Sequence, residues 1–240
     1  MKRIIYSLPI IYSMLFLASC QPAEKQEQAE VQVTGALRNV MHKSELQGIF
    51  DLSTIENQPH TYGLGPIEYL QGELLVFDGK AYQSKVGEDS SIVMKSDFQV
   101  KAPFFVHTQV EEWEMEELPE SVRDIPTLES YLKKITQRRK RPFAFRLEGK
   151  IETANIHVIN LPKDTKVRSH QDAHQGMVNY HLKDEEVDVL GFFSTKHRGV
   201  FTHHDSYVHL HLLTTDRSKM GHLEEMEFDL STIKLFLPKG

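Results

Sequence analysis

Residues 207–224 read YVHLHLLTTDRSKMGHLE, which predicts two neighbouring β-strands joined by a polar turn. Side chains alternate between the two faces of a strand, so His209 and His211 point the same way, roughly 7 Å apart. The segment from Asp216 to Gly221 is polar and ends in glycine, and we expect it to reverse the chain. This reversal brings His222 back beside the histidine pair, on the adjacent strand.

Three imidazoles gathered in this way fit a metal ion. Histidine nitrogens bind zinc at roughly 2.0–2.1 Å, and three protein ligands with one open position are typical of a catalytic zinc site rather than a structural one. The chain holds thirteen histidines, so an HxH pair can also arise by chance in a half-buried strand whose histidines lie at the surface. The spacing alone leaves both interpretations open.

The composition indicates an ordinary globular protein. The sequence is 26% charged and 40% hydrophobic. Its 240 residues are enough for one large domain or for two small lobes that share a core. The formal net charge is −6. A surface of that sign repels phosphate groups and argues against nucleic acid as a partner.

The first twenty residues predict a secretion signal rather than part of the fold. Lys2 and Arg3 precede an apolar stretch that ends in Leu17-Ala18-Ser19-Cys20, and this ending resembles the lipobox of bacterial lipoproteins. Cys20, the only cysteine, would then carry a lipid that anchors an exported protein to the membrane, on the periplasmic or cell-surface side. The alternative is a simple cleaved signal peptide with a chance cysteine. Residues 21–30 predict a solvated tether, and residues 31–240 the folded domain.

The sequence of the folded part indicates few helices. One short helix is expected over residues 35–44 (GALRNVMHKS). A second follows Pro126, with an apolar stripe from Leu128 to Ile135 and a basic end at residues 138–140, before Pro142 stops it. Residues 67–83 predict a hairpin that turns at Asp78-Gly79.

Strands account for most of the remainder. They are expected at residues 143–147, 153–159, 188–194, 207–214 and 225–230. The predicted fold class is therefore α+β: mostly antiparallel or mixed β-sheet in two closely packed lobes, with a few short helices.

Three motifs together resemble the acetolactate decarboxylase family. The run from His209 through Asp216-Arg217 to Gly221-His222 is similar to that family's zinc-binding segment of HLHF, a DR turn and GGH, with Met220 in place of its first glycine. Residues 63–83 resemble its GLGT…DGEL…DGKFYQ stretch, and residues 142–149 (PFAFRLEG) resemble PFYAIRIDG. The likeness runs from about Val31 to the C-terminus, with the motifs in the family's order.

The resemblance implies a zinc-dependent decarboxylation of 2-acetolactate, or a related 2-hydroxy-3-oxo acid, to acetoin and CO2. It implies Zn2+ on His209, His211 and His222, and a homodimer. It also implies that Arg146 holds the substrate carboxylate and that Glu73 transfers a proton. From the residues alone, Arg146 could instead be a surface side chain paired with Glu148, and Glu73 a solvated residue at a strand end.

The chain departs from the family at its C-terminus. It ends at Leu237-Pro238-Lys239-Gly240, without the further segment that supplies the family's last glutamate, so a nearby residue such as Glu225 is a candidate substitute. The pair His203-His204 is either an extra ligand, a support for the ligands or part of a solvated loop.

Two other classes of function stay open at this point. One is a non-catalytic module that binds a metal or a small acid. The other is a cupin-type metal enzyme, which also uses an HxH pair and a later histidine. A cupin needs a fourth ligand a few residues after the pair, where residues 214–216 offer only an aspartate.

Overall fold

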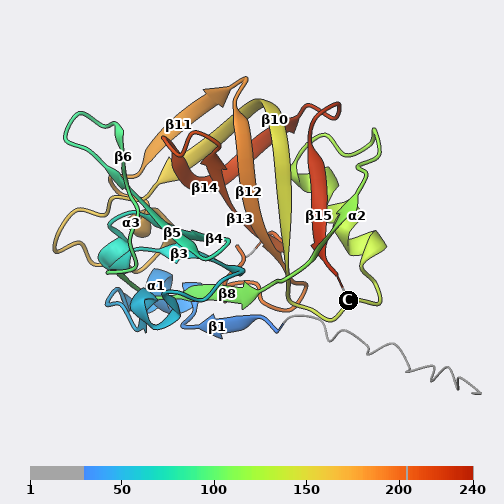
Figure 1. Ribbon diagram of the computed structural model, residues 1–240. Coiled ribbons are helices and arrows are strands. Elements are labelled where there is room, and N and C mark those ends of the chain that lie inside the picture. Colours follow the sequence, from blue (N-terminus) through green and yellow to red (C-terminus); the bar gives the residue numbers. More distant parts are fainter. Residues whose placement is uncertain (1–29, 204, 240) are drawn as a thin grey trace, which may run out of the picture.

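The computed structural model describes residues 30–203 and 205–239, in which β-strands dominate (Figure 1). The expected signal peptide, Cys20, most of the tether and His204 lie outside the described residues. Within the described part of the chain, no helix has the length and apolar character needed to cross a membrane.

The first sheet has six antiparallel strands in the order β1-β8-β3-β4-β5-β6. The expected hairpin is confirmed, because Asp78 and Gly79 both take positive φ angles, 48° and 72°, between β4 and β5. The strands are β1 (Gln32–Thr34), β3 (Thr61–Pro66), β4 (Glu73–Phe77), β5 (Lys80–Val86), β6 (Ile92–Lys95) and β8 (Phe105–Gln109).

The second sheet has seven strands, ordered β12-β13-β14-β10-β15-β9, with β11 added beside β10. Because β10 also pairs with β12, the strands β10, β12, β13 and β14 close on themselves. The strands are β9 (Trp113–Glu116), β10 (Phe143–Val158), β11 (Val178–Lys183), β12 (Glu186–Phe193), β13 (Val208–Thr214), β14 (Met220–Phe228) and β15 (Lys234–Pro238). Two further strands, β2 (Phe50–Asp51) and β7 (Lys101–Ala102), pair with each other.

One long strand replaces two of the expected ones. Residues 143–147 and 153–159 were predicted as separate strands, but β10 runs through both. Its first half pairs with β12 and its second half with β14. Gly149 makes this continuity possible: its φ is 137°, and a Cβ there would lie 2.5 Å from the carbonyl oxygen of Thr232.

The helices are short, as expected, but one boundary was wrong. The first is confirmed as α1 (Leu37–Lys43), while the second, α2 (Ile125–Ile135), ends before the basic residues 138–140. After the helix ends, Arg141 donates to the carbonyl oxygen of Thr136, and Arg139 donates to that of Pro238 on β15. The remaining helical elements are α3 (His170–Ala173), η1 (Leu52–Ile55) and η2 (Glu68–Leu70).

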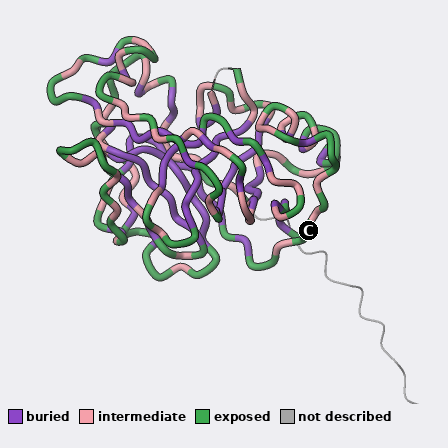
Figure 2. Tube along the Cα trace, turned by 90° about the horizontal axis from the view of Figure 1, so that it is seen from above, coloured by how far each residue is buried: buried purple, intermediate pink, exposed green. Residues whose placement is uncertain are grey.

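A shared core joins the two sheets. One hydrophobic cluster combines Tyr62, Leu75 and Phe77 of the first sheet with Leu190 and Phe192 of the second. Figure 2 shows the buried residues concentrated in the central strands and the exposed ones in the surrounding loops. The α+β fold class with mostly antiparallel sheet is therefore confirmed. The functional side chains lie along this junction.

Candidate metal centre and active site

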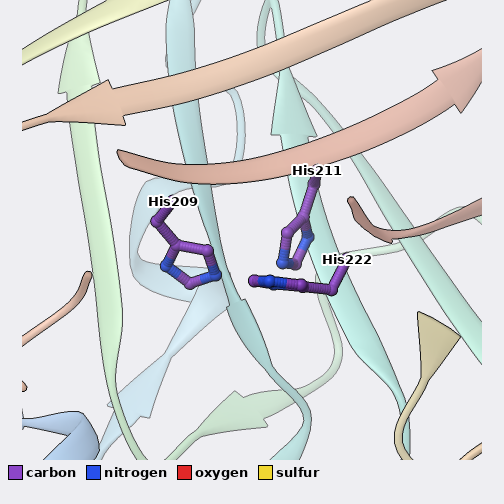
Figure 3. Close-up of side chains that lie close together, drawn as sticks. All are labelled: His209, His211 and His222. Carbon is purple, nitrogen blue, oxygen red and sulfur yellow. The ribbon is translucent and has the colours of Figure 1, made fainter. Parts of the chain in front are cut away.

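The structure brings the three predicted histidines together. His209 and His211 lie on β13, and His211 is the register partner of His222 on β14. One nitrogen from each ring lies within 4.8 Å of the others. Figure 3 shows the three imidazoles pointing toward a common centre. This arrangement can hold a metal ion.

The three rings are buried and electrically neutral. Their exposed fractions are 5% for His209, 0% for His211 and 8% for His222. Burial, with a smaller contribution from neighbouring imidazoles, lowers the pKa of His211 to about 3 and the pKa values of His209 and His222 well below the usual range. Neutral imidazole is the form that binds metal.

The unsatisfied nitrogens show that these residues fit a metal. Nδ1 of His209 and both ring nitrogens of His211 are buried and have no hydrogen-bond partner among the described residues. A buried polar atom without a partner costs about 1–3 kcal/mol. A cation bound there would use lone pairs that the protein leaves without partners on His209 and His211.

Glu73 approaches this centre from the other sheet. It lies on β4 and is 3% exposed. Its Oε2 lies 3.7 Å from Nε2 of His211, and its Oε1 accepts a hydrogen bond from the backbone N–H of Ile159. Burial raises the pKa of Glu73 well above its ordinary value. Glu73 is thus a buried acid beside the histidines and not a solvated residue at a strand end.

Two further residues at the site were missed by the sequence reasoning. The ring of His157, on β10, stacks on that of His222 with centroids 4.7 Å apart. The Oε1 atom of Glu224 lies 2.9 Å from Nδ1 of His157 and 3.8 Å from Nε2 of His222. Contact with His157 lowers the pKa of Glu224, so this carboxylate is ionised near the centre.

A β-bulge explains why Glu224 reaches the site while Glu225 does not. Asn155 of β10 pairs with Glu225, but the next residue, Ile156, pairs with Leu223, so Glu224 is an extra residue in β14. Glu225 instead accepts a hydrogen bond from Asn155 on the exposed surface. Side chains two residues apart in a strand share a face, so the position of His222 could have identified Glu224 as a site residue from the sequence.

A cavity opens beside the histidines. Its volume is about 40 Å3, and it adjoins a larger one of about 300 Å3, with Leu37, Met41 and His203 lining both. The smaller cavity is lined by Leu37, Met41, Pro66, Leu70, Glu73, Phe104, His157, Ile159, His174, His203, His209 and His222.

Arg146 does not lie with the histidines. Leu190 of β12 pairs with Arg146 on one side and with His211 on the other, so a whole strand separates them. The guanidinium forms an ion pair with Glu148 and donates to the hydroxyl of Tyr62.

Aromatic rings enclose the same guanidinium, with the centroids of Phe77, Trp113, Phe236 and Tyr62 at 4.9–5.6 Å. Arg146 is therefore neither a solvated surface residue nor a lining residue of the cavity. Its role with substrate stays a prediction.

These features define a class of protein before any comparison. A β-rich, two-sheet fold holds three neutral imidazoles around one point, with a buried acid on the opposite sheet and a cavity for a small molecule. Such a site is typical of a metal-dependent enzyme that performs acid–base chemistry on a small substrate.

Comparison with known proteins identifies the family. The model of the alpha-acetolactate decarboxylase family matches residues 31–237, and the chain belongs to this family. It is 23% identical to the alpha-acetolactate decarboxylase of Brevibacillus brevis, over 89% of this chain and 75% of that protein. It is 24% identical to that of Bacillus licheniformis, over 90% and 81%.

The fold agrees with this assignment. The crystal structure of alpha-acetolactate decarboxylase from Bacillus subtilis superposes with a TM-score of 0.69 at 17% identity, covering 88% of this chain and 86% of that one. The likeness in structure therefore extends over nearly all of the described residues, and the resemblance predicted from the three motifs is confirmed.

Proposed function

We propose that the protein decarboxylates 2-acetolactate, or a related 2-hydroxy-3-oxo acid, to acetoin and CO2. Membership of the family supports this reaction, and one observation in the structure carries it: a buried, neutral three-histidine centre faces the buried acid Glu73 across one small cavity. A metal-binding module without activity would not need that acid.

His209, His211 and His222 would hold a divalent cation, for which we propose Zn2+. When bound, such a cation stabilises negative charge as it develops on substrate oxygen atoms. The three ligands are all imidazoles, which suit zinc better than magnesium or calcium. With three protein ligands the site would keep a position open for substrate.

Residues of the chain would then supply the proton that forms the new C–H bond. Loss of CO2 breaks a carbon–carbon bond and leaves its electron pair on the substrate as an enediolate. A new C–H bond requires one proton, and we propose that Glu73 supplies it, because burial raises the pKa of its carboxyl group and favours the protonated form. Donation leaves Glu73 ionised, and a proton from solvent restores it. The amide of Ile159 stabilises the ionised form meanwhile.

For Arg146 we propose the role implied by the family, binding the substrate carboxylate. The guanidinium is directed at Glu148 and Tyr62, so it would have to exchange the carboxylate of Glu148 for that of the substrate. A guanidinium can hold either carboxylate through two parallel hydrogen bonds, so the exchange replaces one pair with an equivalent one.

The reaction is tested with racemic acetolactate and purified full-length protein. We expect acetoin release by the wild type, and neither acetoin nor the tightly bound metal in His211→Ala. Absence of acetoin from zinc-loaded wild type would refute the decarboxylase and leave a metal-binding protein. Iron content with oxygen consumption would instead support a cupin-type enzyme.

We also propose export and anchoring through a lipid on Cys20, from the lipobox-like ending of residues 17–20. Wild-type protein should then fractionate with membranes, and Cys20→Ala should not. An equal distribution of the two would contradict the anchor. The homodimer implied by the family is a further proposal, tested by the molar mass of the protein in solution.

A further inference from the structure

A second group of histidines lies beside the centre and has no part in the proposed chemistry. His170 and His174 belong to α3 and its C-terminal cap, in the sequence HQDAH. Residues four apart in a helix lie on one face, and the two ring centroids are only 3.9 Å apart. His203 comes from a different segment, and its ring centroid lies 5.6 Å from that of His170.

The ring of His174 is oriented as a ligand. Its Nδ1 lies 2.7 Å from the backbone carbonyl oxygen of His170, which can only accept, so Nδ1 carries the proton. The other ring nitrogen, Nε2, then keeps its lone pair. Histidines that bind metals are commonly fixed in this way by a backbone carbonyl.

The surroundings are suited to a cation. The carboxylate of Glu224 interacts electrostatically with both His174 and His203. His174 and His203 line the smaller cavity, and His170 and His203 line the larger one. The group therefore stands where the two cavities meet, beside the buried centre.

We propose that His170, His174 and His203 form a second binding site for a divalent transition metal, at the junction of the two cavities. Three imidazoles suit Zn2+, Co2+ or Ni2+, and they do not suit Mg2+. The site goes beyond the proposed decarboxylation, in which none of these three residues takes part.

The second site binds more weakly than the first. Among the described residues, only His209, His211 and His222 have ligand atoms that all lie within 4.8 Å of one another. The second group has to rotate its rings to meet one ion. α3 has only four residues and His203 lies in a loop, so these side chains lose more freedom on binding than those of the buried strands.

The experiment counts metal ions per chain. Untagged full-length protein is stripped with a chelator and dialysed against buffered Zn2+ at increasing free concentration, and bound zinc is measured by mass spectrometry. The wild type should bind two equivalents in two separate steps. The double variant His170→Asn with His174→Asn should lose the weaker step and keep the tighter one.

Matched variants separate this loss from a general effect. His203→Asn should lose the weaker step by itself, which tests the same site from another segment. His60→Asn changes a histidine that pairs with Asp78, outside both groups, and should bind two equivalents. A wild type with one equivalent, or a weaker step that survives in both His203→Asn and the double variant, would overturn the second site.

The count is independent of the proposed reaction. If the wild type binds two equivalents and releases no acetoin, the decarboxylase is refuted and the second site stands. If acetoin forms while only one equivalent binds, the second site is refuted and the decarboxylase stands.

Discussion

Replacing His211 with leucine should change how the stability of the metal-free protein depends on pH. His211 is fully buried at the junction of the two sheets. Burial lowers its pKa to about 3, whereas a histidine in an unfolded chain has a pKa of about 6.5. Leucine has a similar volume and no titrating group. The substitution therefore removes one proton-binding site from the unfolded state and none from the folded state at neutral or mildly acidic pH.

The sign and size of the effect follow from proton linkage. As the pH falls from 7.5 to 5.5, the unfolded chain takes up a proton at residue 211 and the folded chain does not. Folding is therefore destabilised, and the whole effect lies between the unfolded pKa of about 6.5 and the folded pKa of about 3. Over this step one histidine changes the free energy of unfolding by about 1.4 kcal/mol.

Urea unfolding in the presence of a chelator measures the effect. The free energy of unfolding is determined at pH 7.5 and at pH 5.5, and the difference between the two is compared between proteins. This difference should be smaller in His211→Leu than in the wild type by about 1.4 kcal/mol. Glu73 changes the free energy of unfolding with pH in the opposite direction, because burial raises its pKa. It is present in both proteins, so its contribution cancels when the two pH differences are compared.

A matched control separates linkage from lost stability. Leu212→Ala changes the next residue of β13, which is also fully buried, and destabilises the fold without removing a titrating group. It should keep the pH difference of the wild type. If His211→Leu also kept that difference, His211 would take up its proton in the folded state, and the argument for a neutral, metal-ready centre would fail.

Three further predictions concern other residues. Glu73→Gln should keep the tightly bound metal but slow acetoin release by about 10²–10⁴-fold, and unchanged turnover would exclude Glu73 as the proton donor. Arg146→Lys should raise KM for acetolactate, because lysine lacks the guanidinium's fork of donors; an unchanged KM would exclude a carboxylate contact. Gly191→Ala should destabilise the fold by about 1–3 kcal/mol in urea unfolding, because its Cβ would lie 2.3 Å from the ring of Phe145, and wild-type stability would contradict this packing.

Local patterns predicted the parts of the fold that depend on neighbouring residues. The Asp78-Gly79 turn follows from the positive φ angles that this dipeptide accepts. The HxH pair on β13 follows from strand alternation. By contrast, the predicted break within residues 143–159 was wrong, because partner strands on both sides hold β10 as one strand and Gly149 accepts a positive φ within it. Sequence periodicity contains no information about those partners.

The predicted site residues likewise follow from local patterns, whereas the missed ones depend on contacts between strands that are distant in the sequence. His209, His211 and His222 come from one hairpin, so spacing along the chain was enough to bring them together. His157 lies more than fifty residues away and meets His222 only because β10 pairs with β14. The bulge at Glu224 depends on a register shift against the same strand. The family resemblance identified Glu73 as a site residue. Its raised pKa, however, depends on burial beneath the opposite sheet, which the sequence does not show.

The burial of Glu73 also bears on why the two sheets share one core. A carboxyl group on a single exposed sheet would be solvated and ionised at neutral pH, and could not donate a proton to an enediolate. Packing β4 against β13 and β14 removes water from both the acid and the imidazoles. The same desolvation has opposite consequences for the two groups: it raises the pKa of the acid and lowers the pKa values of the imidazoles. One structural feature, the apolar junction between the sheets, therefore shifts both pKa values in the direction that the proposed reaction requires.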